Sequence, residues 1–424
     1  MEEFRIRGGR ALHGSLRVGS AKNAVLPVLA ACVMCPEPIV LNDVPYILDV
    51  ENMLEILRRL GVRCVRDGRR VEIDARDADC FQMPEHLSKQ LRSSIFMMGS
   101  ILTRFDRATV TYPGGCEIGL RPIDLHLKGL EALGARISED HGLIHCDGSA
   151  MRGGDVHLDF PSVGATENVM MAAVTRRGVT RIFNAAREPE IVDLERFINA
   201  MGGDVTGAGS GTVTIEGVAR LHGCEFTPMP DRIVAGTLLC ASAATRGAIT
   251  LTNVRPGDMT DVLGKLRASG SELELSENSV RITTPAVRGF RAYTQPYPGF
   301  PTDLQQPATV LLSTAVGTSV IVETIFESRF KHINEIRRMG AKVSADDRVA
   351  VVEGVSRLTG APVRASDLRA GAALVVAGLM ADAKTEIYNV KYIDRGYDHI
   401  ENKLRLLGAD IERVQAEDDE DDDY

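Results

Sequence analysis

Charged residues recur just before the segments that we expect to form helices, and their types suit the binding of small polyanions. Lys22, Asp303 and Arg369 precede strongly apolar segments, whereas residues 327–329 and 394–395 precede amphipathic ones. Taken singly, each is most simply a helix cap or a solvated side chain. Six basic residues occupy such equivalent loops: Lys22, Arg92, Arg121, Arg329, Arg369 and Arg395. Gathered in one cleft, they would bind carboxylate and phosphate oxygens two at a time.

Cys116 is the candidate for a reactive thiol. Its loop contains Gly114, Gly115 and Gly119 and is followed by Arg121. Neighbouring Arg and Lys charges favour a thiolate over a thiol. The simpler alternative is a small residue in a flexible loop. We expect Cys116 to be more nucleophilic than the other seven cysteines.

No motif indicates a metal or a cofactor. Cys32 and Cys35 have the CxxC spacing, but they lie in an apolar stretch with no second pair and no nearby His. The glycine-rich string 207–211 precedes the alternating run 212–215, which predicts a hairpin turn and not a dinucleotide-binding loop. We therefore expect neither a metal nor a cofactor.

Six glycines mark an internal repeat. They are Gly61, Gly134, Gly202, Gly270, Gly340 and Gly408, separated by 73, 68, 68, 70 and 68 residues. Each follows a segment with helical spacing, as Val50, Met53 and Leu57 show before Gly61. The glycine is therefore expected in the left-handed conformation that ends a helix, which a Cβ would oppose.

Each repeat also contains an earlier, uniformly apolar segment, which predicts a helix buried on nearly all sides. These segments are 24–33, 95–102, 169–174, 233–244, 308–316 and 372–380. A β-rich run follows each, so the repeat is predicted as helix, strand, loop, helix, strand. Because 424 residues exceed what one core holds, the six repeats group into two domains of three. The loop-like stretch 221–230 is the expected boundary.

The composition predicts a cytoplasmic protein with no strong charge field. The longest apolar runs, 24–35 and 370–381, are shorter than the ~20 residues of a membrane span. The N-terminus is acidic where a signal peptide is basic, so the cysteines are expected to be reduced. Outside 417–423, which holds seven acids, 49 basic residues face 51 acidic ones, which argues against nucleic acid. Residues 416–424 are expected to be a disordered tail.

Seven longer motifs occur in order along the chain. They are 22–24, 113–119 with 121–126, 162–166, 184–193, 300–303, 326–330 and 394–397. Together they resemble UDP-N-acetylglucosamine 1-carboxyvinyltransferase, the enolpyruvyl transferase family that opens peptidoglycan synthesis, over Phe4 to about Val414. The resemblance implies an α/β fold, the two-domain inside-out α/β barrel of six repeats. It implies domains of 22–229 and of 1–21 plus 230–415.

The reaction that the resemblance implies moves the enolpyruvyl group of phosphoenolpyruvate to the 3-hydroxyl of UDP-N-acetylglucosamine and releases phosphate. An alcohol adds to C2 of the enol ether only if C3 is protonated, so an acid and a base are needed. By matching, Asp303 takes the hydroxyl proton, and Cys116 acts as acid or helps to release product. Lys22 and Arg395 complete the catalytic set. The two substrates are the implied partners, without membrane insertion, and the oligomeric state stays open.

The same matching implies a ligand set for each substrate. The set for phosphoenolpyruvate is Lys22, Asn23, Arg121, Arg329, Arg369 and Arg395. The set for UDP-N-acetylglucosamine is Asn23, Arg92, Arg121, Pro122, Ile123, Asp124, Leu125, Ser162, Val163, Gly164, Asp303, Ile325 and Glu327. Within it, Ser162 to Gly164 offer backbone amides to the diphosphate at a helix start.

Two departures and two alternatives accompany the resemblance. Phe160 stands where many relatives have a Lys that reaches the diphosphate, and residues 305–307 are Gln-Gln-Pro where Gln-Ala-Gln is commoner, a variation associated with a second copy of the enzyme. One alternative is a related enolpyruvyl transferase that acts on a shikimate phosphate, against which the motifs at 113–116 and 162–166 argue. The other is a repeat scaffold without turnover, against which the retained catalytic set argues.

Overall fold

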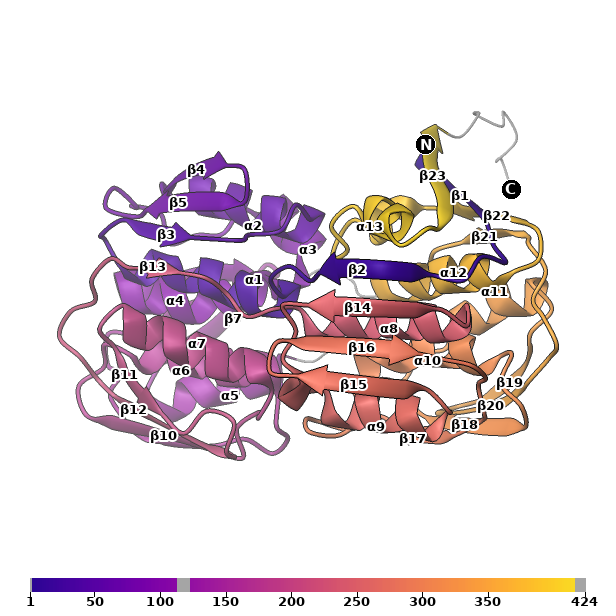
Figure 1. The fold of residues 1–424 in the computed structure, drawn as a ribbon. Helices are drawn as coiled ribbons and strands as arrows, with labels where there is room; N and C mark the ends of the chain where they lie inside the picture. Colours follow the sequence, from indigo (N-terminus) through magenta and orange to yellow (C-terminus); the bar gives the residue numbers. More distant parts are fainter. Residues whose placement is uncertain (1, 113–122, 416–424) are drawn as a thin grey trace. The chain divides into compact units, whose positions relative to one another are not determined.

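A computed structural model describes residues 2–112 and 123–415, except for the side chains of 89, 90, 92 and 93 (Figure 1). The described residues divide into two compact units. The N-terminal unit consists of 19–112 and 123–229, and the C-terminal unit consists of 2–18 and 230–415. Cys116, Arg121 and Pro122 lie outside the described residues. Each unit contains three of the six repeats.

The predicted apolar helices are confirmed, with different ends, and they are buried along most of their length. They are α1 (Lys22–Ala31), α4 (Met97–Phe105) and α6 (Val163–Ala173) in the N-terminal unit, and α8 (Arg232–Ala244), α10 (Gln305–Leu312) and α12 (Leu368–Met380) in the C-terminal unit. α6 begins six residues earlier than its apolar run because the Ser162 hydroxyl caps it, accepting from the Ala165 amide at 3.3 Å. In the C-terminal unit α8, α10 and α12 pack against one another.

The amphipathic helices and their terminal glycines are confirmed as well. The helices are α2 (Leu48–Arg59), α5 (Asp124–Ala132), α7 (Pro189–Ala200), α9 (Thr260–Ala268), α11 (His332–Arg338) and α13 (Ile400–Leu406). The glycine that follows each has a φ between 86° and 102°. At α2 the Val62 amide returns to the Leu57 carbonyl at 3.0 Å, which satisfies a carbonyl at the helix end. A short helix, α3 (Glu85–Gln90), completes the α-helices of the described residues.

Five of the six glycines are followed by a hairpin of two strands where one strand was predicted, whereas Gly408 is followed by β23 alone among the described residues. The N-terminal unit contains β3 (Ile39–Leu41), β4 (Arg63–Asp67), β5 (Arg70–Asp74), β6 (Arg107–Thr111), β7 (Arg136–Asp140), β8 (Leu143–Asp147), β9 (Asp155–His157), β10 (Val179–Phe183), β11 (Asp204–Thr206), β12 (Thr212–Glu216) and β13 (Glu225–Phe226). The first strand of each hairpin was missed because it is mostly exposed, as β4 and β7 show. The glycine-rich string 207–211 joins β11 to β12, as predicted.

The C-terminal unit repeats this arrangement with strands from both ends of the chain. Its strands are β1 (Glu2–Arg7), β2 (His13–Arg17), β14 (Ala248–Thr252), β15 (Glu272–Ser276), β16 (Ser279–Thr283), β17 (Arg291–Tyr293), β18 (Thr318–Val322), β19 (Lys342–Asp346), β20 (Val349–Glu353), β21 (Pro362–Arg364), β22 (Lys384–Tyr388) and β23 (Asp410–Gln415). β1 lies between β22 and β23 and is antiparallel to both. β2 runs parallel to β14, and β14 lies in front of the buried helix α8 in Figure 1.

The sheets close each unit into a ring of three. The orders are β13-β3-β5-β4, β6-β8-β7 and β9-β10-β12-β11 in one unit, and β2-β14-β16-β15, β17-β18-β20-β19 and β21-β22-β1-β23 in the other. The parallel edge strand of a sheet comes from the preceding repeat: β13, from the end of the N-terminal unit, pairs with β3 at its start. The expected loop 221–230 therefore contains a strand. With helices inside and sheets outside, each unit has the predicted inside-out α/β architecture.

No helix among the described residues is long and apolar enough to cross a membrane.

The glycines that end the amphipathic helices allow a test of backbone strain, because at Gly408 a substitution causes no steric clash. At Gly408 the φ is 90°, and an added Cβ would meet nothing within 4 Å. Gly408→Ala should lower the free energy of unfolding by about 1 kcal/mol, because only the left-handed conformation opposes the Cβ. The control is Gly264→Ala, inside α9 with equally open space, which should raise it by about 0.5–1 kcal/mol through helix propensity. Urea unfolding measures both, and changes of the same sign would contradict the assignment.

Candidate active site

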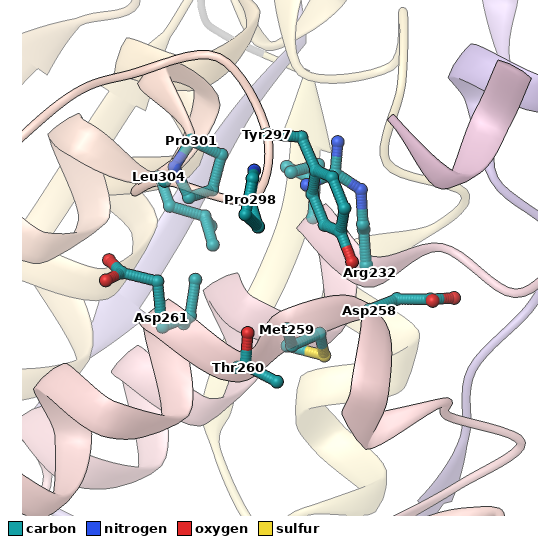
Figure 2. Close-up of a pocket in the computed structure, with 12 residues that line it drawn as sticks. Arg232, Asp258, Met259, Thr260, Asp261, Tyr297, Pro298, Pro301 and Leu304 are labelled. Carbon is teal, nitrogen blue, oxygen red and sulfur yellow. The ribbon is translucent and has the colours of Figure 1, made fainter. Parts of the chain in front are cut away.

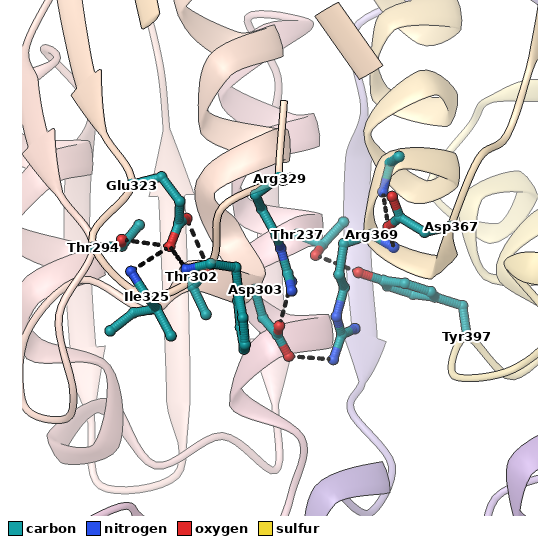
Figure 3. Close-up of polar contacts among 12 residues, drawn as sticks. Thr237, Thr294, Thr302, Asp303, Glu323, Ile325, Arg329, Asp367, Arg369 and Tyr397 are labelled. Carbon is teal, nitrogen blue, oxygen red and sulfur yellow. Dashed lines mark hydrogen bonds and ion pairs between the residues drawn. The ribbon is translucent and has the colours of Figure 1, made fainter. Parts of the chain in front are cut away.

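Asp303 is held between two buried guanidinium groups in the C-terminal unit. Arg329 Nη2 donates to Asp303 Oδ1 at 2.6 Å, and Arg369 Nη2 donates to Asp303 Oδ2 at 2.9 Å (Figure 3). The Arg329 and Arg369 side chains are only 2% and 5% exposed. Three of the predicted site residues are thus brought together. Because each carboxylate oxygen faces a different Arg, this one group compensates two buried positive charges.

Both guanidinium groups have donors to spare. Arg329 Nε and Arg369 Nη1 are buried and have no hydrogen-bond acceptor among the described residues. A buried N–H of a charged group without an acceptor is costly, so such donors usually meet a ligand or water. The arrangement therefore favours a small anion whose oxygens accept from both groups.

The surroundings of Arg369 keep it charged and in place. Asp367 caps α12 by accepting from the Arg369 and Ala370 amides, each at 3.0 Å. Burial alone would lower the pKa of Arg369, but Asp303, Tyr397 and Asp231 raise the pKa above its ordinary value. The Tyr397 ring lies 5.4 Å from the guanidinium carbon, and its hydroxyl is 2.9 Å from Thr237 Oγ1 (Figure 3).

The segment that leads to Arg329 carries Ile325 and Glu327. This segment follows β18. Glu327 accepts from Arg348 Nη2 at 3.3 Å, and this contact is exposed to solvent. Arg395, in the turn after the short 3₁₀ helix η5 (Val390–Tyr392), is half-buried. Its neighbour Asp394 accepts from Arg413 at 2.6 and 3.0 Å, which anchors this turn to β23.

In the N-terminal unit, Lys22 forms a second buried ion pair. Lys22 is the first residue of α1, and its Nζ lies 2.6 Å from Asp49 Oδ2 in α2. The Asp49 side chain is 1% exposed. The pair fixes the Lys22 ammonium at the helix start, one residue before Asn23.

The start of α6 is built from small residues and tight hydrogen bonds. Thr166 Oγ1 donates to the Ser162 carbonyl at 2.8 Å and accepts from the Ala186 amide at 3.0 Å. Gly164 lies so close to His126 that a Cβ would come within 2.9 Å of its ring. The first amides of α6, at Val163 and Gly164, are thus at a helix start where an anion is favoured.

His126 is held in one orientation beside this helix start. Asn168 Nδ2 donates to His126 Nδ1 at 2.9 Å and to the Ile95 carbonyl at 3.0 Å, and Asn168 Oδ1 accepts from the Gly99 amide at 2.7 Å. An amide nitrogen only donates, so this orientation of Asn168 places the imidazole proton on Nε2. Ile123, Asp124 and Leu125 lie just before His126, where α5 begins. Phe160, two residues before Ser162, is 47% exposed.

A pocket in the C-terminal unit lies beside the Asp303 turn but does not include Asp303. It is partly open to solvent, and its lining includes Arg232, Tyr297 and Pro301 (Figure 2). Arg232 lies 5.6 Å from the centre of the Tyr297 ring. Because Asp303, Arg329 and Arg369 do not line this pocket, the anion site and the pocket are different features.

Four predicted site residues are described incompletely or not at all. Cys116, Arg121 and Pro122 fall outside the described residues, and Arg92 is described by its backbone alone, in the 3₁₀ helix η2 (Arg92–Phe96).

Several residues that build the site were not predicted. Asp49 lies four residues before Met53 and seven before Ile56, and both of these are buried. Residues at this spacing share one face of a helix, so the sequence did indicate that Asp49 is buried. Tyr397 lies in a recognised motif, but nothing in the sequence indicated its contact with Thr237. Glu323, which accepts four hydrogen bonds beside the Asp303 turn, ends a β-rich run and carries no local signal.

Comparisons with known proteins agree with this geometry. The model of the EPSP synthase (3-phosphoshikimate 1-carboxyvinyltransferase) family matches residues 6–404. Among solved structures, the enolpyruvyl transferase NikO from Streptomyces tendae has a TM-score of 0.87 at 22% identity, covering 98% of this chain and 99% of its own. EPSP synthase from Acinetobacter baumannii has a TM-score of 0.75 at 17% identity, covering 98% and 100%. These likenesses establish the fold.

Sequence relatives are much closer. UDP-N-acetylglucosamine 1-carboxyvinyltransferase 2 of Caldanaerobacter subterraneus subsp. tengcongensis is 48% identical over 98% of this chain and 100% of its own length. UDP-N-acetylglucosamine 1-carboxyvinyltransferase of Glaesserella parasuis serovar 5 is 46% identical over 98% and 99%. The chain therefore belongs to the UDP-N-acetylglucosamine 1-carboxyvinyltransferase family, within the wider group of enolpyruvyl transferases.

Proposed function

We propose that this protein transfers the enolpyruvyl group of phosphoenolpyruvate to the 3-hydroxyl of UDP-N-acetylglucosamine and releases phosphate. The observation that supports this most strongly is the Asp303 carboxylate between two buried guanidinium groups with donors to spare. It combines a base with a binding site for an anion, which is what an alcohol and an anionic enol ether require. A place in peptidoglycan synthesis and cell division, and a cytoplasmic location, belong to the same proposal.

The proton movements follow from the reaction. Asp303 takes the proton of the 3-hydroxyl while the oxygen of that hydroxyl bonds to C2 of phosphoenolpyruvate. C3 receives a proton from an acid, for which Cys116 is the candidate. In the tetrahedral adduct a proton then returns from C3 to the acid and the C2–O bond to phosphate breaks, which restores the double bond. The phosphate leaves with the proton that Asp303 had taken. All atoms are accounted for without a cofactor.

Charge compensation explains the other residues. Arg329 and Arg369 would exchange the Asp303 carboxylate for oxygens of phosphoenolpyruvate, which frees Asp303 to act as a base. Lys22, Arg121 and Arg395 are proposed to complete the anion site. The start of α6, at Ser162 to Gly164, would hold the diphosphate, where Phe160 cannot supply a cation.

The relatives favour this acceptor over a shikimate phosphate. Those named for UDP-N-acetylglucosamine are 44–48% identical over nearly the whole chain, whereas the solved EPSP synthases are 17–18% identical. Phosphate release from phosphoenolpyruvate, measured with UDP-N-acetylglucosamine, with shikimate 3-phosphate and without acceptor, tests the proposal. Release that depends on the nucleotide sugar is expected. Release with shikimate 3-phosphate alone, or with neither acceptor, would contradict it.

The base role predicts a loss of turnover in Asp303→Asn. The amide keeps the shape but cannot take the proton, so kcat should fall by about 10² or more while both substrates still bind. Asp382→Asn, at the exposed pair with Arg357, is the control and should keep wild-type turnover. Steady-state kinetics measures kcat of both variants, and calorimetry measures whether the substrates still bind. Near-normal turnover in Asp303→Asn would remove Asp303 from this role.

The anion site predicts a stability change that phosphate reverses. Asp303→Ala leaves two buried guanidinium groups uncompensated, which should lower the free energy of unfolding by about 3 kcal/mol. Inorganic phosphate should then raise the unfolding midpoint more in this variant than in wild type, because it replaces the missing carboxylate. Asp382→Ala should change stability by less than about 1 kcal/mol. Equal stabilisation of variant and wild type by phosphate would count against an anion site here.

Thiol chemistry predicts selective alkylation of Cys116. Burial raises the pKa of Cys64, Cys146 and Cys240 to about 12 and that of Cys224 to about 11, and it also raises the pKa of Cys32 and Cys35. These thiols stay protonated and unreactive at pH 7. A small anionic epoxide that mimics phosphoenolpyruvate, such as fosfomycin, should therefore modify Cys116 in preference to these six thiols, and faster with the nucleotide sugar present. Peptide mass mapping with Cys116 unmodified would refute the prediction.

A further inference from the structure

Glu323 is a buried carboxylate that accepts four hydrogen bonds next to the Asp303 turn. Its Oε1 accepts from Thr294 Oγ1 at 2.9 Å and from the amides of Ile325 and Phe326 at 2.9 and 3.1 Å. Its Oε2 accepts from Thr302 Oγ1 at 2.8 Å (Figure 3). Glu323 is 1% exposed. These four donors are neutral, so a charged group is buried here at a cost that its hydrogen bonds must offset.

The donors belong to three separate segments that meet at this one carboxylate. Thr294 follows β17, Thr302 directly precedes Asp303, and Ile325 and Phe326 lead to Arg329. Two of these segments carry the partners of the ion pair between Asp303 and Arg329. The carboxylate therefore connects the segment that bears the base to the segment that bears an anion ligand.

We propose that Glu323 is a positioning residue that sets the place of Asp303 relative to Arg329. It acts through the Thr302 hydroxyl on one side and the Ile325 and Phe326 amides on the other. The proposal rests on the proposed function, since it concerns the base of that reaction. A displacement of the base by about 1 Å is enough to lower the rate of the chemical step up to 10²-fold.

The donor pattern predicts which substitutions are tolerated. Oε1 faces two amides and one hydroxyl, so this position must remain an acceptor. Oε2 faces only the Thr302 hydroxyl, which can rotate and accept instead of donating. In Glu323→Gln the amide nitrogen can take the Oε2 position and keep all four contacts, whereas Glu323→Ala loses them.

Thr294 offers a matched control for Thr302. Both hydroxyls donate to the same carboxylate, and Thr294 Oγ1 also accepts from the Thr324 amide at 2.8 Å. Thr294→Val thus removes at least as many hydrogen bonds as Thr302→Val. It does so away from Asp303, so a merely structural role of Glu323 would make Thr294→Val the more damaging change.

The experiment compares kcat and KM of Glu323→Ala, Thr302→Val and the double variant with wild type. Each single variant should lower kcat about tenfold with little change in KM, and the double variant should be no worse than either single one. Thr294→Val, Thr302→Ser and Glu323→Gln should keep kcat within about threefold of wild type. If Glu323→Ala does not fold, the kcat of Thr302→Val compared with that of Thr302→Ser and of Thr294→Val still tests the proposal.

Additive effects in the double variant, or equal losses in Thr294→Val and Thr302→Val, would overturn the proposal. Amide hydrogen exchange gives a readout that does not depend on turnover. Exchange at Ile325 and Phe326 should be faster in Glu323→Ala and unchanged in Glu323→Gln, and unchanged exchange in both would also overturn it. Absence of turnover in wild type would contradict the proposed function alone, because the exchange measurement would still test the positioning role.

Discussion

The structure of the site depends on one constraint: two buried positive charges share a single carboxylate. The Arg329 and Arg369 side chains are almost fully buried, and Asp303 compensates both with one oxygen each. A buried charge without a partner is strongly destabilising, so an anion at this place stabilises the fold. In the free protein Asp303 is that anion. A substrate with carboxylate and phosphate oxygens can take over the role, and the freed carboxylate then becomes available as a base.

The repeat architecture explains how such residues are positioned. Each buried helix begins at one edge of its unit, so residues at successive helix starts, such as Asp303 and Arg369, come from repeats far apart in sequence yet meet. Capping fixes these starts: Asp231 accepts from two amides at 2.8 Å in α8, and Asp367 accepts from two amides at 3.0 Å in α12. Because the helices are buried on all sides, their starts cannot move independently of the core.

Sequence alone predicted the features that depend on local chemistry. The glycines at helix ends and the apolar helices follow from periodicity and backbone preference. The extra strands were missed because short, exposed strands such as β4 carry little apolar signal. Contacts between distant residues, such as Tyr397 with Thr237 or Glu323 with Thr302, have no local signature, since only tertiary packing brings them together. The family resemblance supplied the reaction, which spacing could not.

The central claim, that a substrate anion takes over the guanidinium groups that Asp303 occupies, is tested most directly by a crystal structure. The protein would be crystallised with UDP-N-acetylglucosamine and an unreactive phosphonate analogue of phosphoenolpyruvate. The account predicts oxygens of the analogue within about 3 Å of Arg329 Nε and Arg369 Nη1. An analogue bound elsewhere, with both nitrogens still lacking an acceptor and both Asp303 ion pairs intact, would contradict it.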